Sequence, residues 1–231
     1  MPTANKTGAV RMSPFPPLPR FGLDEARDAI SGGKLIAFPT ETFYGIGCDA
    51  MNPDAVASVF ALKRRSLSMP LPVIINSRDM LNLLARPVVG AAAALMDAFW
   101  PGPLSIVLAA LPEVPDLLTA GIGRVAVRFS PHPAALALCA ATGLPVVASS
   151  ANISGRPPVV RPEDLDAELT PGLSGLFIEG PQPSGLLPST VVDIRERLGK
   201  AVVRILRPGA VSREALEVQG FAVLEKTDAP Q

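Results

Sequence analysis

Proline is the residue that most constrains this chain, because 26 of its 231 residues are proline. That share is about twice the average for globular proteins. Proline lacks a backbone amide hydrogen and clashes with the preceding helical turn, so it ends helices and is confined to the edges of sheets. The prolines are spread along the chain and divide it into short segments. They therefore exclude a bundle of long helices.

Between the prolines, strand patterns alternate with helix patterns. Apolar spacing and capping residues predict helices at 23–33, 52–65, 79–85, 88–100, 133–143 and 212–218. Short apolar runs predict strands at 34–38, 71–76, 105–111, 124–129, 144–150, 175–180, 189–195 and 201–207. This alternation, with hairpin-like stretches near the end, predicts an α/β fold with a mixed sheet. We see no repeat and no second domain, and we expect a proline-rich leader at 1–20, one domain at 21–212, and a C-terminal helix and polar tail at 213–231.

Charge and composition exclude several classes of protein. Lys+Arg and Asp+Glu both number 21, which argues against a surface that grips nucleic acid or anionic membrane throughout, although a local basic cleft remains open. Cys48 and Cys139 are the only cysteines and lie in no CxxC motif, so we expect two buried thiols in a reducing cytosol. The single histidine, His132, excludes a histidine-based metal cluster and argues against a Ser-His-Asp triad.

The leader lacks the apolar core of a signal peptide, and no apolar run approaches the ~18 residues of a membrane helix. We therefore expect a cytoplasmic protein with no membrane contact.

Two polar loops directly follow apolar strands. Thr40, Glu41, Thr42 and Tyr44 come after the strand at 34–38. Four polar residues, Ser149, Ser150, Asn152 and Ser154, lie at the end of the apolar run 144–148 and just beyond it. Such residues commonly make turns to their own backbone. Ligands of open α/β sheets, however, bind beyond the carboxyl ends of the strands, so the loops are also candidates for one phosphate-binding site.

A glycine pattern in the first loop argues weakly for a different ligand. Residues 45–50 match the GxGxxA of dinucleotide-binding proteins. Polar residues separate this pattern from the strand, and the next helix begins too late, at Asn52 and Pro53. The dinucleotide interpretation is therefore a poor one.

Four cations are candidates for the same site. Lys63, Arg64 and Arg65 close the helix at 52–65, where cations are also favoured by the helix dipole. Lys63 and Arg65 can serve one site only if the helix stops between them, and the segment Ser66 to Pro70 makes that stop plausible. Arg128 and Arg207 end two predicted strands and, with Lys63 and Arg65, would complete the basic pocket that a triphosphate requires.

Taken in order, the motifs of residues 20–212 resemble the YrdC-like family, whose single-domain members are threonylcarbamoyl-AMP synthases. The resemblance rests on PTETFYGIGCDA, the KxR at Lys63, PGPLSIVL, VAVRF before His132-Pro133, SSANISGRP, STVVDI and ILRPG. It implies an open, twisted mixed β-sheet flanked by helices, with a basic concave cleft. It also implies a reaction in which L-threonine, bicarbonate and ATP give threonylcarbamoyl-AMP and pyrophosphate, for later transfer to tRNA by other proteins.

The resemblance implies a set of site residues and partners. The catalytic residues would be Lys63 and Arg65, with no protein metal ligand. ATP is expected as a substrate with Mg²⁺ held mainly by phosphates, and the expected partners are L-threonine, bicarbonate, a tRNA-modifying transferase complex and, weakly, tRNA. The expected substrate- and ATP-binding residues are Thr40, Tyr44, Lys63, Arg65, Arg128, Ser150, Asn152, Ser189 and Arg207.

Two positions depart from the family pattern, because Ser66 and Ser130 stand where proline is usual. Both are next to expected site residues, so they put loop geometry in doubt more than chemistry. Two alternative functions stay open at this point. One is an RNA-binding module that uses the basic face, and the other is a paralogue that acts on another carbamoyl or threonylcarbamoyl compound.

Overall fold

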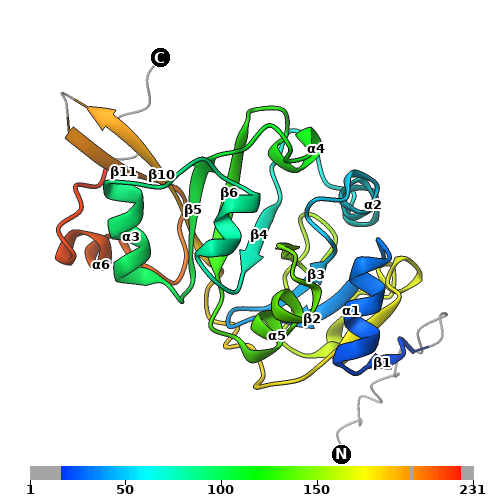
Figure 1. Ribbon diagram of the computed structural model, residues 1–231. Coiled ribbons are helices and arrows are strands. Elements are labelled where there is room, and N and C mark those ends of the chain that lie inside the picture. The colour runs from blue at the N-terminus through cyan, green and yellow to red at the C-terminus, as the bar shows by residue number, and fades with distance from the viewer. Residues whose placement is uncertain (1–16, 198–199, 225–231) are drawn as a thin grey trace, which may run out of the picture.

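The strands of the computed structural model form two mixed sheets with helices packed around them (Figure 1). The structure describes residues 17–197 and 200–224. The five-stranded sheet has the order β1 (Arg20–Phe21), β9 (Gly175–Phe177), β2 (Ile36–Pro39), β3 (Tyr44–Gly47), β8 (Ser149–Ser150). The six-stranded sheet has the order β11 (Lys200–Arg207), β10 (Thr190–Arg197), β5 (Leu104–Ala109), β6 (Arg124–Phe129), β4 (Pro72–Ile75), β7 (Val146–Val147).

Both sheets combine parallel and antiparallel pairs, which confirms the predicted mixed α/β class. The α-helices are α1 (Leu23–Ser31), α2 (Pro53–Lys63), α3 (Ala91–Phe99), α4 (Asp116–Thr119), α5 (Pro133–Thr142) and α6 (Arg213–Val218). The 3₁₀ helices are η1 (Asp79–Leu83), η2 (Pro162–Asp164) and η3 (Thr170–Gly172).

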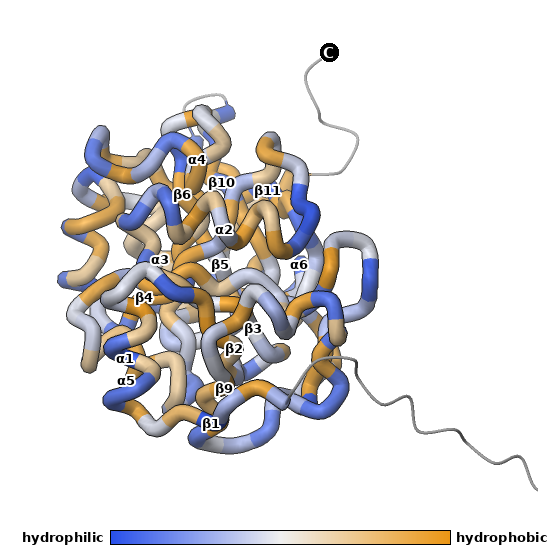
Figure 2. Tube along the Cα trace, turned by 90° about the vertical axis from the view of Figure 1, so that its right-hand side faces the viewer, coloured by the Kyte–Doolittle hydropathy of each residue, from blue (hydrophilic) through white to orange (hydrophobic). Residues whose placement is uncertain are grey.

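The apolar core lies between the strands and these helices. Phe38, Ile46, Ile74 and Phe177 are buried in it, and Figure 2 shows polar segments concentrated in the outer loops. Burying such side chains is the main favourable term in folding. Trp100 is also buried, and its indole N–H donates to the carbonyl of Leu104 at 2.7 Å.

The two sheets are joined where β7 passes into β8. Only Ala148 separates β7, which pairs with β4 of one sheet, from β8, which pairs with β3 of the other. The Ala148 amide donates to the carbonyl of Pro72 at 2.9 Å, and the Val147 amide donates to that of Cys48 at 2.9 Å. Both polar loops singled out in the sequence therefore lie at the junction of the sheets.

Several local predictions are confirmed by their capping contacts. The Asn52 side chain accepts hydrogen bonds from two amides of the first turn of α2, and Pro53 is its first residue. Helix α2 stops after Lys63, where Arg64 takes the left-handed conformation (φ 50°), so Arg65 leaves the helix as the shared site required. Cys48 and Cys139 are buried and unpaired.

Other local predictions need correction. Tyr44 and the glycines that follow it were predicted to lie in a polar loop. They form strand β3, which makes a hairpin with β2. Gly47 lies in this strand, and a Cβ there would stand 2.6 Å from the ring of Phe38, so close packing accounts for the glycine at this position without a dinucleotide. The strand predicted at 144–150 is two short strands in different sheets, and the helical segment predicted at 79–85 is the 3₁₀ helix η1. Strand β1 and helix α4 were not predicted.

The predicted division into leader, domain and tail stays a prediction. Leader residues 1–16 and tail residues 225–231 lie outside the described residues. Within the described part of the chain, no helix is long and apolar enough to cross a membrane.

Candidate active site

A polar cavity of about 110 Å³ opens at the junction of the two sheets. Seven of the nine predicted site residues line it, and they come from six separate stretches of the chain. These residues are Thr40, Tyr44, Arg65, Arg128, Ser150, Ser189 and Arg207. The other two, Lys63 and Asn152, do not line the cavity.

Arg65 enters the cavity because α2 ends two residues earlier. Its Nε donates to the carbonyl of Met69 at 3.1 Å, and its Nη2 donates to that of Pro70 at 2.9 Å. These bonds hold the guanidinium in place while leaving N–H groups for a ligand. Partial burial lowers the pKa of Arg65 from its ordinary value.

Lys63 lies behind the cavity wall. Its side chain is 2% exposed, and its Nζ donates to the carbonyl of Ser150, to the carbonyl of Asn152 at 2.6 Å, and to Asn152 Oδ1 at 3.5 Å. Burial, and next the charge of Arg65, lower the pKa of this ammonium to about 7. In this structure Lys63 therefore fixes the loop that carries Ser150.

Asn152 completes the same support. Its Oδ1 accepts from the Ser150 hydroxyl at 2.6 Å, and its Nδ2 donates to the carbonyls of Ile153 at 3.0 Å and Arg156 at 2.6 Å. Of the two predicted site residues in this loop, Ser150 lines the cavity. Asn152 lies behind it and contacts its hydroxyl.

Arg207 and Ser189 form a second wall. The Arg207 Nη2 donates to the carbonyl of Ser189 at 2.7 Å and to its hydroxyl at 2.8 Å, and that hydroxyl also lies 3.2 Å from the hydroxyl of buried Ser105. Much of the Arg207 residue is exposed. Its guanidinium is nevertheless partly desolvated, and this burial, followed by the charges of Arg128 and Arg65, lowers its pKa. Arg207 is thus close enough to the other two arginines to be repelled by them.

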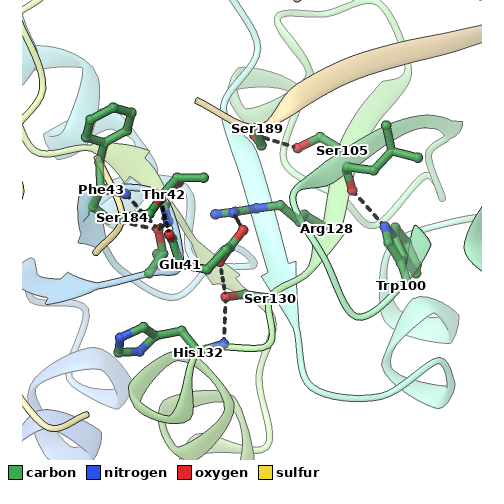
Figure 3. Close-up of polar contacts among 12 residues, drawn as sticks. Glu41, Thr42, Phe43, Trp100, Ser105, Arg128, Ser130, His132, Ser184 and Ser189 are labelled. Carbon is green, nitrogen blue, oxygen red and sulfur yellow. Dashed lines mark hydrogen bonds and ion pairs between the residues drawn. The ribbon is translucent and has the colours of Figure 1, made fainter. Parts of the chain in front are cut away.

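Arg128 is paired with a carboxylate that the sequence analysis did not select (Figure 3). Its Nη1 forms an ion pair with Glu41 Oε1, and the hydroxyl of Ser130 donates to Glu41 Oε2. The Arg128 and Glu41 side chains are 6% and 16% exposed. The sequence did contain a clue to this pair, because Glu41 is the one acidic residue in a loop that was expected to lie near arginines. Ser105 was missed because it looks like an ordinary strand residue.

Thr40 and Tyr44 line the cavity from the hairpin of β2 and β3. The Thr40 hydroxyl donates to the carbonyl of Phe43 at 2.8 Å and lies 3.2 Å from that of Thr42. The hydroxyl of Thr40 is thus engaged in shaping the turn. The phenol of Tyr44 is buried, and desolvation followed by the charge of Glu163 raises its pKa.

An apolar groove of about 330 Å³ adjoins the cavity on the six-stranded sheet. Arg65, Pro72 and Arg207 line both hollows. The groove's other walls are mainly apolar and include Met69, Pro70, Val107, Ile122, Ala126, Val191 and Leu206. A ligand with a flat apolar part and an anionic part could therefore occupy both hollows.

Comparison with known proteins identifies the family. The model of the family Sua5/YciO/YrdC, described as "Telomere recombination", matches residues 28–209. This chain belongs to that family.

Members of the Sua5/YciO/YrdC family resemble this chain over most of its length. It is 37% identical over 194 residues to the threonylcarbamoyl-AMP synthase of Bacillus subtilis, covering 84% of this chain and 55% of that protein. It is 39% identical over 202 residues to the putative threonylcarbamoyl-AMP synthase of Mycobacterium tuberculosis, covering 86% and 89%. Among solved structures, P. abyssi Sua5 complexed with L-threonine matches with a TM-score of 0.79 and 34% identity, covering 89% of this chain and 61% of that one.

The chain therefore spans between half and two thirds of the length of the Bacillus and Pyrococcus proteins that it matches. Membership of the Sua5/YciO/YrdC family establishes the fold. The roles of the individual site residues stay predictions.

Proposed function

We propose that this chain makes L-threonylcarbamoyl-AMP from L-threonine, bicarbonate and ATP, with release of pyrophosphate. The observation that carries the proposal is the convergence of Arg65, Arg128 and Arg207 on one small polar cavity. Arg207 is held near Arg65 and Arg128 although their charges repel its own, and this clustering of cations indicates an anionic ligand with several charges. Relatives that bear the name threonylcarbamoyl-AMP synthase support this choice among anionic ligands.

The two hollows suggest how ATP would lie. Its phosphates would bind in the cavity, where arginines match phosphate oxygens in geometry and charge. Its base would extend into the adjoining groove between Met69 and Leu206. Threonine would then lie near Thr40 and Ser189, which line the same cavity. The solved structure of the Pyrococcus relative in complex with L-threonine supports an amino-acid site in this family.

The proposed chemistry needs no protein nucleophile. Bicarbonate supplies CO₂ with loss of water, and the amine of threonine adds to this CO₂ and gives up a proton to form a carbamate. A carbamate oxygen then attacks the α-phosphorus of ATP. A new O–P bond forms as the bond to pyrophosphate breaks. Such transfer depends on positioning and on charge stabilisation. Arg65 and Arg207, which line the cavity, would stabilise charge on the phosphates and on the leaving pyrophosphate.

Lys63 and Asn152 would act on this reaction from behind the cavity wall. Both contact Ser150, and Lys63 also contacts the Asn152 carbonyl. They would keep the Ser150 hydroxyl and the neighbouring backbone at a fixed distance from the phosphates. We therefore propose that Lys63 acts by positioning Ser150 and not by direct contact with the phosphates.

The proposed reaction also implies a metal ion, a protein that uses the product, and a cellular compartment. Mg²⁺ would enter with ATP and be held through phosphate oxygens and water, and we assign no residue of this chain to it. A transferase complex that modifies tRNA would consume the adenylate. The two unpaired thiols fit a reducing cytoplasm, where we place the protein.

Mass spectrometry of the nucleotide products tests the proposal. Purified protein with ATP, L-threonine and bicarbonate should give threonylcarbamoyl-AMP and pyrophosphate, and omission of any one substrate should abolish both. Formation of ADP would refute attack at the α-phosphate. Absence of any product, combined with tRNA binding tighter than ATP binding, would favour an RNA-binding module.

A further inference from the structure

Glu41 joins three segments of the chain beside the cavity (Figure 3). Its carboxylate contacts Arg128 at the end of β6 and Ser130 just beyond it. Its backbone carbonyl accepts from the amide of Ser184 at 3.2 Å and from the hydroxyl of Ser184 at 2.9 Å. The hairpin that carries Glu41 is thus tied both to β6 and to the segment that leads into β10.

Ser130 and His132 hold the carboxylate from the other side. The Ser130 hydroxyl donates to Glu41 and accepts from the amide of His132 at 3.2 Å, and Ser130 is fully buried. His132 in turn caps α5 through Nδ1, and its Nε2 lies 2.9 Å from the carbonyl of Pro181. A proline at 130 has no hydroxyl, so this anchor depends on the departure from the family pattern.

The ion pair with Glu41 is the polar contact that fixes Arg128 among the described residues. A guanidinium has five donors in one plane, so binding one edge to a carboxylate sets the direction of the others. Arg128 lines the cavity, and its remaining donors are therefore available to an anion there. We propose that Glu41 is a positioning residue, which orients Arg128 toward the anion in the cavity and is itself anchored by Ser130.

This inference rests on the proposed function only in taking the cavity as a polyphosphate site. A purely electrostatic role for Glu41 predicts the opposite effect, because a carboxylate near the cavity repels an anion and its removal would strengthen binding. Positioning predicts that its removal weakens binding, because Arg128 loses its orientation. The sign of the change thus separates the two roles.

The test is a double-mutant cycle read by calorimetric binding of inorganic pyrophosphate. Glu41→Gln, which keeps the shape of the side chain, should weaken binding about tenfold, the order expected for one lost charge-assisted hydrogen bond. In an Arg128→Gln background the same change should have no effect or strengthen binding, because only the repulsion is removed. Pyrophosphate binding by Glu41→Gln as tight as that of the wild type, or equal losses in both backgrounds, would overturn the inference.

Two further variants test the role of Ser130 and control for the loss of an ion pair elsewhere. Ser130→Ala keeps both charges and removes only the anchor, so it should weaken binding about threefold. Unchanged binding would remove Ser130 from the proposal. Glu217→Gln breaks the exposed Arg213–Glu217 pair, which does not line the cavity, and should stay within about twofold of the wild type. Because pyrophosphate binding needs no turnover, an inactive wild type would refute the proposed function and leave this cycle intact.

Discussion

The buried ammonium of Lys63 should make the stability of this protein rise with pH. Burial lowers its pKa from 10.5 to about 7 in the folded chain. Between pH 7 and 9 the unfolded chain keeps this proton while the folded chain releases it. Because the unfolded state then binds more protons, the free energy of unfolding increases with pH over this range.

The size of the effect follows from the two pKa values. At one pKa unit per about 1.4 kcal/mol, the folded chain gains about 2 kcal/mol from pH 7 to pH 9 through this one residue. Cys48 and Cys139 act in the opposite direction, because burial raises their pKa values and only the unfolded thiols ionise near pH 9. Comparison with Lys63→Met removes their contribution, since both proteins contain them.

Urea unfolding at pH 7, 8 and 9 measures the effect, with fluorescence of the single, buried tryptophan Trp100 as the probe. The difference in unfolding free energy between the wild type and Lys63→Met should change by about 2 kcal/mol across this range. Lys34→Met replaces an exposed lysine and should keep the wild-type dependence. Equal pH dependence in the wild type and Lys63→Met would refute the reasoning, and would mean that the ammonium stays charged between its carbonyl partners.

Three other outcomes are expected. Arg65→Ala should lower kcat/KM for ATP by roughly 10²–10³, while the melting temperature of the variant changes little because only two loop carbonyls lose a donor. Steady-state kinetics and thermal unfolding measure the two effects, and near-normal turnover would mean that Arg65 only supports the chain after α2. Ser189→Ala should raise the KM for threonine and narrow the preference for threonine over valine, because a polar contact is lost; an unchanged preference in competition assays would remove Ser189 from the amino-acid site. Cys48 and Cys139, buried and with raised pKa values, should resist a thiol reagent at pH 8 until urea is added; rapid labelling of native protein would contradict their placement.

Local features of the sequence were sufficient for much of the fold. Asn52 and Pro53 start α2 through contacts within its first turn, and the helix ends at Lys63 as the following polar segment indicated. Strands with apolar runs, such as β5 and β6, were placed within a residue or two. These features depend on neighbours a few residues apart, which is why pattern and propensity predict them.

Most of the site residues named from the sequence line the cavity. Thr40, Arg128 and Arg207 do so because they lie at the ends of strands that meet at one place. The sequence could not decide which of the candidate residues face the cavity. Lys63 looks like a solvated helix end, yet it is buried because its ammonium meets the carbonyl of Asn152, 89 positions away. Arg128 looks like a free cation, yet it meets Glu41, 87 positions away. Such pairs depend on how two sheets join at Ala148 and on how much water is excluded there, and neither quantity is encoded by spacing along the chain.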